Sequence, residues 1–246
     1  MLQTIKLLDV TITAETEEKI LEYVVSSVHT SSRKLFITTP NPEILVYAST
    51  HPEYKVRLNT ADIALPDGIG LLLGGYIMGK QLPERIAGVD FMEKLCLACR
   101  EKPMSIGFLG GRGGVAELAA ERLKKKYPWI TVVWVGEEWG TSKNDALRYS
   151  NLEKPIDILF VAFGHPKQEK WIYENLDNLP VKAAMGVGGA FDYLSGKVVR
   201  APKVVRLLGF EWLFRLIVQP WRWRRQMALF TFLLLLIKER FGRKGR

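Results

Sequence analysis

The sequence predicts an α/β protein with a Rossmann-like, mainly parallel sheet flanked by helices and with a helical appendage at the C-terminus. Short runs of β-branched and apolar residues alternate along the chain with longer amphipathic segments, which is the pattern of strands that cross over through helices. Several of the short runs end in a loop that joins glycine or proline to a polar residue, as expected of ligand-binding loops in such sheets. The 246 residues are enough to bury a substantial core.

The expected elements follow one another without a low-complexity linker or an internal repeat. Strands are expected where β-branched and apolar residues cluster, at residues 34–38, 63–65, 105–109, 131–135, 156–162 and 183–187. Helices are expected where apolar residues recur at helical spacing, at residues 15–28, 42–48, 90–100, 115–127 and 167–175. Residues 1–202 are therefore predicted to form one α/β domain, and residues 203–246 the appendage.

The appendage carries the entire net charge of the chain. The chain has 35 Lys and Arg against 26 Asp and Glu, which gives a net charge of +9. Residues 201–246 hold 11 of these bases and 2 of these acids, so this segment alone has a charge of +9 and the rest sums to zero. Ten of the 11 residues at 227–237 are apolar. A helix of this length spans roughly 16 Å, about half of the ~30 Å hydrocarbon core of a bilayer.

An interfacial helix on an anionic membrane surface is the expected role of this tail. Basic residues bracket the apolar run, and each contributes about 1 kcal/mol near an anionic leaflet, while Trp212, Trp221 and Trp223 have rings favoured at headgroup depth. The alternative is a helix packed on the protein's own core or on another subunit of a homo-oligomer. The first residues lack a signal-peptide pattern, so we expect a cytoplasmic protein, peripheral on the inner face of the plasma membrane.

The polar loops after the strands should converge on one site, because ligands bind at the carboxyl ends of strands in open α/β sheets. The loop at residues 110–114 is Gly-Gly-Arg-Gly-Gly and precedes an expected helix, so its backbone N–H groups suit a phosphate. It matches neither Gly-x-Gly-x-x-Gly nor a Walker A loop. Tight-turn geometry explains Gly110 and Gly111 equally well.

Three polar side chains in these loops suggest chemistry. Asp67 lies between Pro66 and Gly68 directly after an expected strand, where a carboxylate could take a proton from a hydroxyl nucleophile. An Asx turn or a helix cap is the commoner role of Asp beside Gly. Arg85 suits phosphate oxygens, and Gln168 can donate without adding charge. A surface salt bridge or a cap is the alternative for both.

Absent motifs narrow the chemistry further. No Asp-x-Asp pair occurs, so no metal is expected, and a departing diphosphate would need positive side chains and amides instead. No Gly-x-Ser-x-Gly elbow occurs, which counts against an α/β-hydrolase. Cys96 and Cys99 fall within an expected amphipathic helix, which favours packing over redox or metal chemistry, and the three histidines form no ligand-spaced cluster.

The ordered set of motifs closely resembles the WecG/TagA/CpsF family of bacterial glycosyltransferases, and its TagA-type members most of all because of the tail. The resemblance runs from about residue 9 to residue 225 and departs at residues 136–140 (Gly-Glu-Glu-Trp-Gly), where relatives tend to have Gly-Tyr-Phe. The matching segments are residues 39–43 (Thr-Pro-Asn-Pro-Glu), 66–68 (Pro-Asp-Gly), 84–88 (Glu-Arg-Ile-Ala-Gly), 166–169 (Pro-Lys-Gln-Glu), 188–192 (Gly-Gly-Ala-Phe-Asp), 200–202 (Arg-Ala-Pro) and 211–215 (Glu-Trp-Leu-Phe-Arg).

The resemblance implies an inverting transfer of a sugar from a UDP-sugar, the donor substrate, to a sugar linked through diphosphate to undecaprenol, without a cofactor. In TagA-type members the sugar is N-acetylmannosamine, the acceptor is lipid-linked N-acetylglucosamine, and the product serves wall teichoic acid synthesis. The residues that match the family's functional positions are Asp67 as general base; Thr39, Arg85 and Gln168 at other active-site positions; Asn41, Gly188, Gly189 and Asp192 at the nucleotide; and Arg215, Arg222 and Arg225 as tail arginines near the diphosphate. Gly110 and Gly111 join the nucleotide set from their loop pattern.

Other interpretations stay open at this point. The same fold could use UDP-N-acetylmannosamine uronic acid or UDP-glucose for another surface polysaccharide. From a different class, the chain could be a non-catalytic nucleotide-binding or nucleic-acid-binding protein with a basic tail, but such tails are rarely so apolar and no nucleic-acid-binding motif occurs. We therefore expect no nucleic-acid partner. An inactive scaffold is disfavoured because Asp67, Arg85 and Gln168 are all present.

Overall fold

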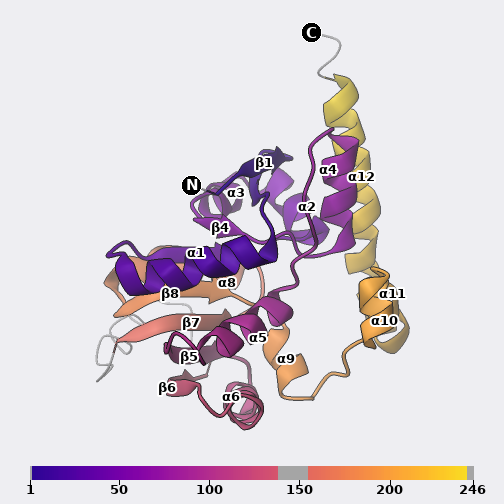
Figure 1. Ribbon diagram of the computed structural model, residues 1–246. Helices are drawn as coiled ribbons and strands as arrows, with labels where there is room; N and C mark the ends of the chain where they lie inside the picture. Colours follow the sequence, from indigo (N-terminus) through magenta and orange to yellow (C-terminus); the bar gives the residue numbers. More distant parts are fainter. Residues whose placement is uncertain (1, 138–154, 243–246) are drawn as a thin grey trace.

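A six-stranded parallel sheet lies at the centre of the protein (Figure 1). The computed structural model describes residues 2–137 and 155–242. The strands lie in the order β4-β3-β8-β7-β5-β6, and each neighbouring pair is parallel. This confirms the predicted fold class. The bounds are β3 (Leu35–Thr38), β4 (Ile63–Ala64), β5 (Ser105–Gly110), β6 (Thr131–Gly136), β7 (Ile156–Ala162) and β8 (Val181–Gly186).

Helices cover both faces of this sheet, which is why the inner strands are apolar along their whole length rather than at alternate positions. Successive side chains of a strand point to opposite faces, so Ile158 and Phe160 of β7 join one core cluster and Leu159 and Val161 join another. The first cluster includes α1 (Glu17–Thr30), α5 (Gly88–Ala98), α6 (Val115–Lys126) and α9 (Ala190–Leu194), and the second includes α8 (Lys167–Asn175) and η1 (Leu176–Asn178).

Several elements occur where the sequence predicted none, among them four in the first 77 residues. β1 (Thr4–Leu7) and β2 (Val10–Thr13) form an antiparallel hairpin, α3 (Pro52–Asn59) follows α2 (Pro42–Thr50), and α4 (Ile69–Ile77) follows β4. The hairpin turn places Leu8 and Asp9 at positive φ, a conformation that such residues rarely take, so no glycine signalled it. Helix α4 contains three glycines in nine residues, which lowers its intrinsic helix propensity.

A second hydrophobic core lies beside the sheet, between the hairpin, α2, α3, α4 and the end of the chain. The tail forms α10 (Lys203–Leu207), α11 (Glu211–Val218), η2 (Pro220–Arg222) and α12 (Trp223–Gly242). Figure 1 shows α12 running alongside α4. Phe232 and Leu236 of α12 are fully buried in this core.

Two glycines of α4 make this close approach possible. A Cβ added at Gly70 would lie 2.6 Å from Leu229 Cδ1, and one added at Gly74 would lie 2.7 Å from Leu236 Cδ1 and 2.8 Å from Phe232 Cζ. Real Cβ atoms do not approach other atoms so closely, so a larger residue at either position would force the neighbouring side chains, including those of α12, to move. The glycines that weaken α4 as a helix therefore form the groove that holds α12.

The opposite face of α12 exposes a stripe of large apolar side chains to solvent. They are Trp223, Met227, Phe230, Leu234, Ile237 and Phe241. In the described ranges no helix is long and apolar enough to cross a bilayer. One face of α12 thus packs on the protein's own core, as the alternative to an interfacial helix proposed. The other face is exposed and apolar, as an interfacial helix requires. Both the domain boundary at residue 202 and the oligomeric state stay predictions.

Candidate active site

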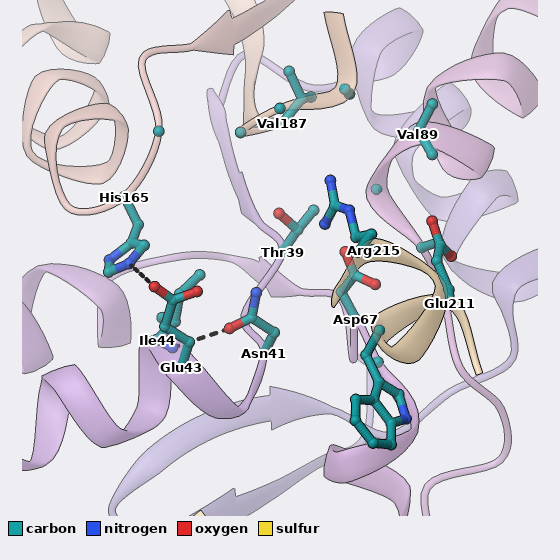
Figure 2. Close-up of a pocket in the computed structure, with 18 of the residues that line it drawn as sticks. Thr39, Asn41, Glu43, Ile44, Asp67, Val89, His165, Val187, Glu211 and Arg215 are labelled. Atoms are coloured by element: carbon teal, nitrogen blue, oxygen red, sulfur yellow. Dashed lines mark hydrogen bonds and ion pairs between the residues drawn. The ribbon is translucent and has the colours of Figure 1, made fainter. Parts of the chain in front are cut away.

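A cavity of about 500 Å³ opens at the carboxyl ends of β3, β4, β7 and β8. Figure 2 shows Thr39 and Asn41 from the loop after β3, Asp67 from the loop after β4, His165 from the loop after β7 and Val187 from the loop after β8. The convergence of these four loops was predicted from the sequence. The tail supplies further lining residues, namely Glu211, Trp212, Arg215, Gln219, Gln226 and Leu229.

Asp67 points into this cavity from the short loop between β4 and α4 (Figure 2). Its backbone N–H donates to the Pro40 carbonyl at 3.0 Å, and its carboxylate accepts a hydrogen bond from the Gly88 N–H. Helix α4 begins after Gly68 without a side-chain cap, so Asp67 is not used as the cap that its sequence context would also allow. The carboxylate is held by the backbone and left facing the cavity.

The charges around Asp67 have opposing effects on its pKa. Burial is the largest cause, and together with the negative charge of Glu211 it raises the pKa of Asp67 to about 6. Arg85, the Gly88 N–H and Arg215 act in the other direction because they favour the carboxylate. Glu211 and Arg215 both lie on α11, so the tail contributes one charge of each sign to the surroundings of this carboxyl.

An ion-pair network joins the tail to the domain beside Asp67. Glu211 accepts from Arg85 Nη1 at 3.2 Å and lies 3.7 Å from Arg200 Nε. Asp90 accepts both Arg200 Nη1 and Nη2 at 2.7 Å and also pairs with Arg206 Nη1 at 3.3 Å. Sequence reasoning missed Glu211 and Asp90. The available signal was that Glu211 is one of only two acids in the basic tail.

Arg215 reaches the middle of the cavity from α11 and lies between Thr39 and Glu211 in Figure 2. Its guanidinium carbon is 4.7 Å from the centre of the Tyr193 ring, a cation–π contact. A Cβ added at Gly189 would lie 3.6 Å from Asp192 Oδ2 and 4.0 Å from Arg215 Nη2. The structure thus brings together the predicted residues Gly189, Asp192 and Arg215.

Three further predicted site residues are hydrogen-bonded within the protein. The Thr39 hydroxyl donates to the Gly186 carbonyl at 3.1 Å, and Asn41 Oδ1 caps α2 by accepting the Ile44 N–H at 3.0 Å. Gln168 Oε1 accepts the Gly188 N–H at 2.8 Å. All three side chains line the cavity, but these contacts show that they also fix the loops that form its walls.

The remaining predicted residues lie elsewhere or cannot be placed. Gly110 and Gly111 are outside the cavity lining. A carboxylate of the protein itself lies at the N-terminus of the neighbouring helix α6, where the N–H of the N-cap Gly114 donates to Glu137 Oε1 at 3.0 Å. The nucleotide role of Gly110 and Gly111 stays a prediction. The side chains of Arg222 and Arg225, and positions 138–140 of the divergent loop, are outside the described residues.

The two cysteines are remote from this chemistry. Cys96 and Cys99 are free, buried thiols at the end of α5. Burial raises the pKa of both thiols, that of Cys99 to about 11, which opposes formation of a reactive thiolate. They pack in the first core cluster.

Comparisons with known proteins agree with the geometry. The profile of the Glycosyl transferase WecG/TagA/CpsF family matches residues 5–246. A Bacillus spizizenii protein named N-acetylglucosaminyldiphosphoundecaprenol N-acetyl-beta-D-mannosaminyltransferase is 34% identical over 203 residues, which cover 82% of this chain and 79% of that protein. A protein with the same name from Bacillus subtilis is 32% identical over 85% of this chain and 81% of its own length. Another from Staphylococcus aureus is 32% identical over 79% of this chain and 75% of its own length. This chain belongs to the WecG/TagA/CpsF family of glycosyltransferases.

Proposed function

We propose that the protein transfers N-acetylmannosamine from UDP-N-acetylmannosamine to N-acetylglucosamine on undecaprenyl diphosphate, with inversion at the transferred sugar. The relatives' names specify this acceptor and this sugar in β linkage. The observation that carries the proposal is the position of Asp67, whose carboxylate faces a cavity that also contains Arg85 and Arg215. Such a site combines a base with fixed positive charge, the two groups that glycosyl transfer to a hydroxyl needs.

Asp67 is the proposed general base. The acceptor hydroxyl oxygen forms a bond to C1 of the donor sugar, the bond between C1 and the diphosphate oxygen breaks, and the hydroxyl proton passes to the carboxylate. A pKa of about 6 keeps most of this carboxyl ionised at neutral pH, yet makes it a stronger base than an ordinary aspartate. Burial and Glu211, the causes of the raised pKa, thereby favour the proposed role.

Positive side chains and backbone groups are proposed to hold the donor without a metal. Arg85 and Arg215 would offset the charge that develops on the departing UDP, with Arg222 and Arg225 from the tail adding to them. We assign the nucleotide to the end of the cavity lined by Gly188, Gly189 and Asp192. Thr39, Asn41 and Gln168 would orient the substrates through the loops that they hold, and Gly110 and Gly111 remain candidates at the diphosphate.

The tail is proposed to hold the enzyme on the inner face of the plasma membrane, where a lipid-linked acceptor would lie. The exposed apolar stripe of α12 faces away from the core, and the tail carries the net charge of +9. An apolar face with basic residues around it suits an anionic bilayer surface. The same tail lines the cavity through Glu211 and Arg215, so membrane binding and the site share one segment.

Asp67→Asn should abolish most turnover while leaving UDP binding within about twofold of the wild type, because the amide keeps the shape but cannot accept the proton. UDP release and the mass of the product, with lipid-linked N-acetylglucosamine as acceptor, measure turnover. Asp177→Asn, at an exposed position outside the cavity, is the matched control and should keep full activity. Near wild-type turnover by Asp67→Asn would remove Asp67 as the base.

Turnover should rise with pH through about 6 as Asp67 loses its proton. The charged groups that face it are Arg85, Glu211 and Arg215. Glu211→Gln removes the negative charge that raises the pKa of Asp67, so the acid limb of the kcat profile should move to lower pH. An unchanged limb, or one displaced to higher pH, would show that Glu211 does not act on the base.

Replacing two exposed residues of α12, Phe230→Ser with Leu234→Ser, should reduce binding to liposomes that contain anionic lipid by at least tenfold without unfolding the protein, because both side chains are solvent-exposed. Cosedimentation measures binding, and a thermal melt checks the fold. Val56→Ser on α3 removes an equally exposed apolar residue and should bind like the wild type. Equal binding by all three proteins would contradict a membrane role for the stripe.

A further inference from the structure

Glu169 is a buried carboxyl group to which the proposed chemistry assigns no role. It is fully buried in α8, and burial raises its pKa. The buried hydroxyl of Tyr54 lies beside this carboxyl group and interacts with it. Burying a carboxyl group carries a desolvation cost that hydrogen bonds have to offset.

The other oxygen of Glu169 fixes the orientation of a cavity-lining amide. Glu169 Oε1 accepts a hydrogen bond from Gln168 Nε2 at 2.7 Å, and Gln168 Oε1 accepts the Gly188 N–H at 2.8 Å. A side-chain amide has one donating and one accepting end. Because Glu169 Oε1 accepts, it binds the NH₂ end, and the carbonyl end is left for Gly188.

The turn held by this amide forms one end of the cavity. Gly188 has a φ of 54° and, with Gly189, leads from β8 into α9. The position of this turn fixes Gly189, which lies beside Asp192 Oδ2 and Arg215 Nη2. A flipped Gln168 amide would present NH₂ to the Gly188 N–H, two donors facing each other, and the turn would have to move.

We propose that Glu169 is a positioning residue for the nucleoside diphosphate: by orienting the Gln168 amide, it holds the Gly188–Gly189 turn in the shape that receives the donor. This rests on the proposed function only in assigning the nucleotide to that end of the cavity. Glu169 does not line the cavity, whereas Gln168 does. What it supplies is an acceptor atom at a fixed place, not its charge.

Substitutions at Glu169 and Gln168, with UDP as the probe in calorimetry, test this proposal. Glu169→Gln keeps an acceptor in place and should bind UDP within about threefold of the wild type. Glu169→Met has similar length but no acceptor, and should weaken UDP binding about tenfold, raise KM for the donor by the same factor and leave kcat within about twofold. Circular dichroism melts verify that each variant is folded.

A double variant separates positioning from a general structural effect. If Glu169 acts only through Gln168, then Glu169→Met with Gln168→Met should bind UDP no more weakly than Gln168→Met alone. Additive losses, or equal losses for Glu169→Gln and Glu169→Met, would overturn the proposal while leaving the proposed function intact. A wild-type protein that does not bind UDP would overturn both.

Discussion

The packing of α12 into the groove formed by Gly70 and Gly74 of α4 is the interaction on which the site depends. It seals the second core through Phe232 and Leu236 and brings the preceding helix α11 to the carboxyl edge of the sheet. Without this contact the tail would be held mainly by the ion pairs of Glu211 with Arg85 and Arg200 and of Arg206 with Asp90.

The electrostatics of the cavity follow from this arrangement. The domain contributes Asp67 and Arg85, and α11 adds Glu211 and Arg215. Glu211 raises the pKa of Asp67 and pairs with Arg85, while Arg215 lowers the same pKa. A tail that also binds a membrane would therefore change both the strength of the base and the charge available to a leaving diphosphate. Under the proposed membrane role, the location of the enzyme and the charges of its site would depend on one segment.

Much of this architecture could be predicted because it depends on local patterns. The six sheet strands produce continuous apolar runs, and the polar loops that follow them identify the edge where Asp67 lies. The hairpin, α4 and the ion-pair network depend instead on tertiary contacts. Gly70 and Gly74 are explained by side chains from other helices packed against them, and Glu211 by Arg200 and by Arg85, which is 126 positions earlier in the chain. Gln168 and Thr39 were predicted to act on the substrates. The structure shows that both also form hydrogen bonds to the backbone of the protein, at Gly188 and Gly186.

The central claim is that a docked tail completes the active site, and Gly74→Leu tests it most directly. The added side chain would overlap Leu236 and Phe232, so α12 should leave its groove while the sheet stays folded. Hydrogen exchange at α11 and α12, recorded together with turnover on the lipid-linked acceptor, is the decisive measurement. We predict faster exchange in both helices, unchanged protection of β5, β7 and β8, and at least a tenfold loss of turnover, with Leu73→Ala on the exposed side of α4 as an active control. Full turnover with an undocked tail would contradict the account.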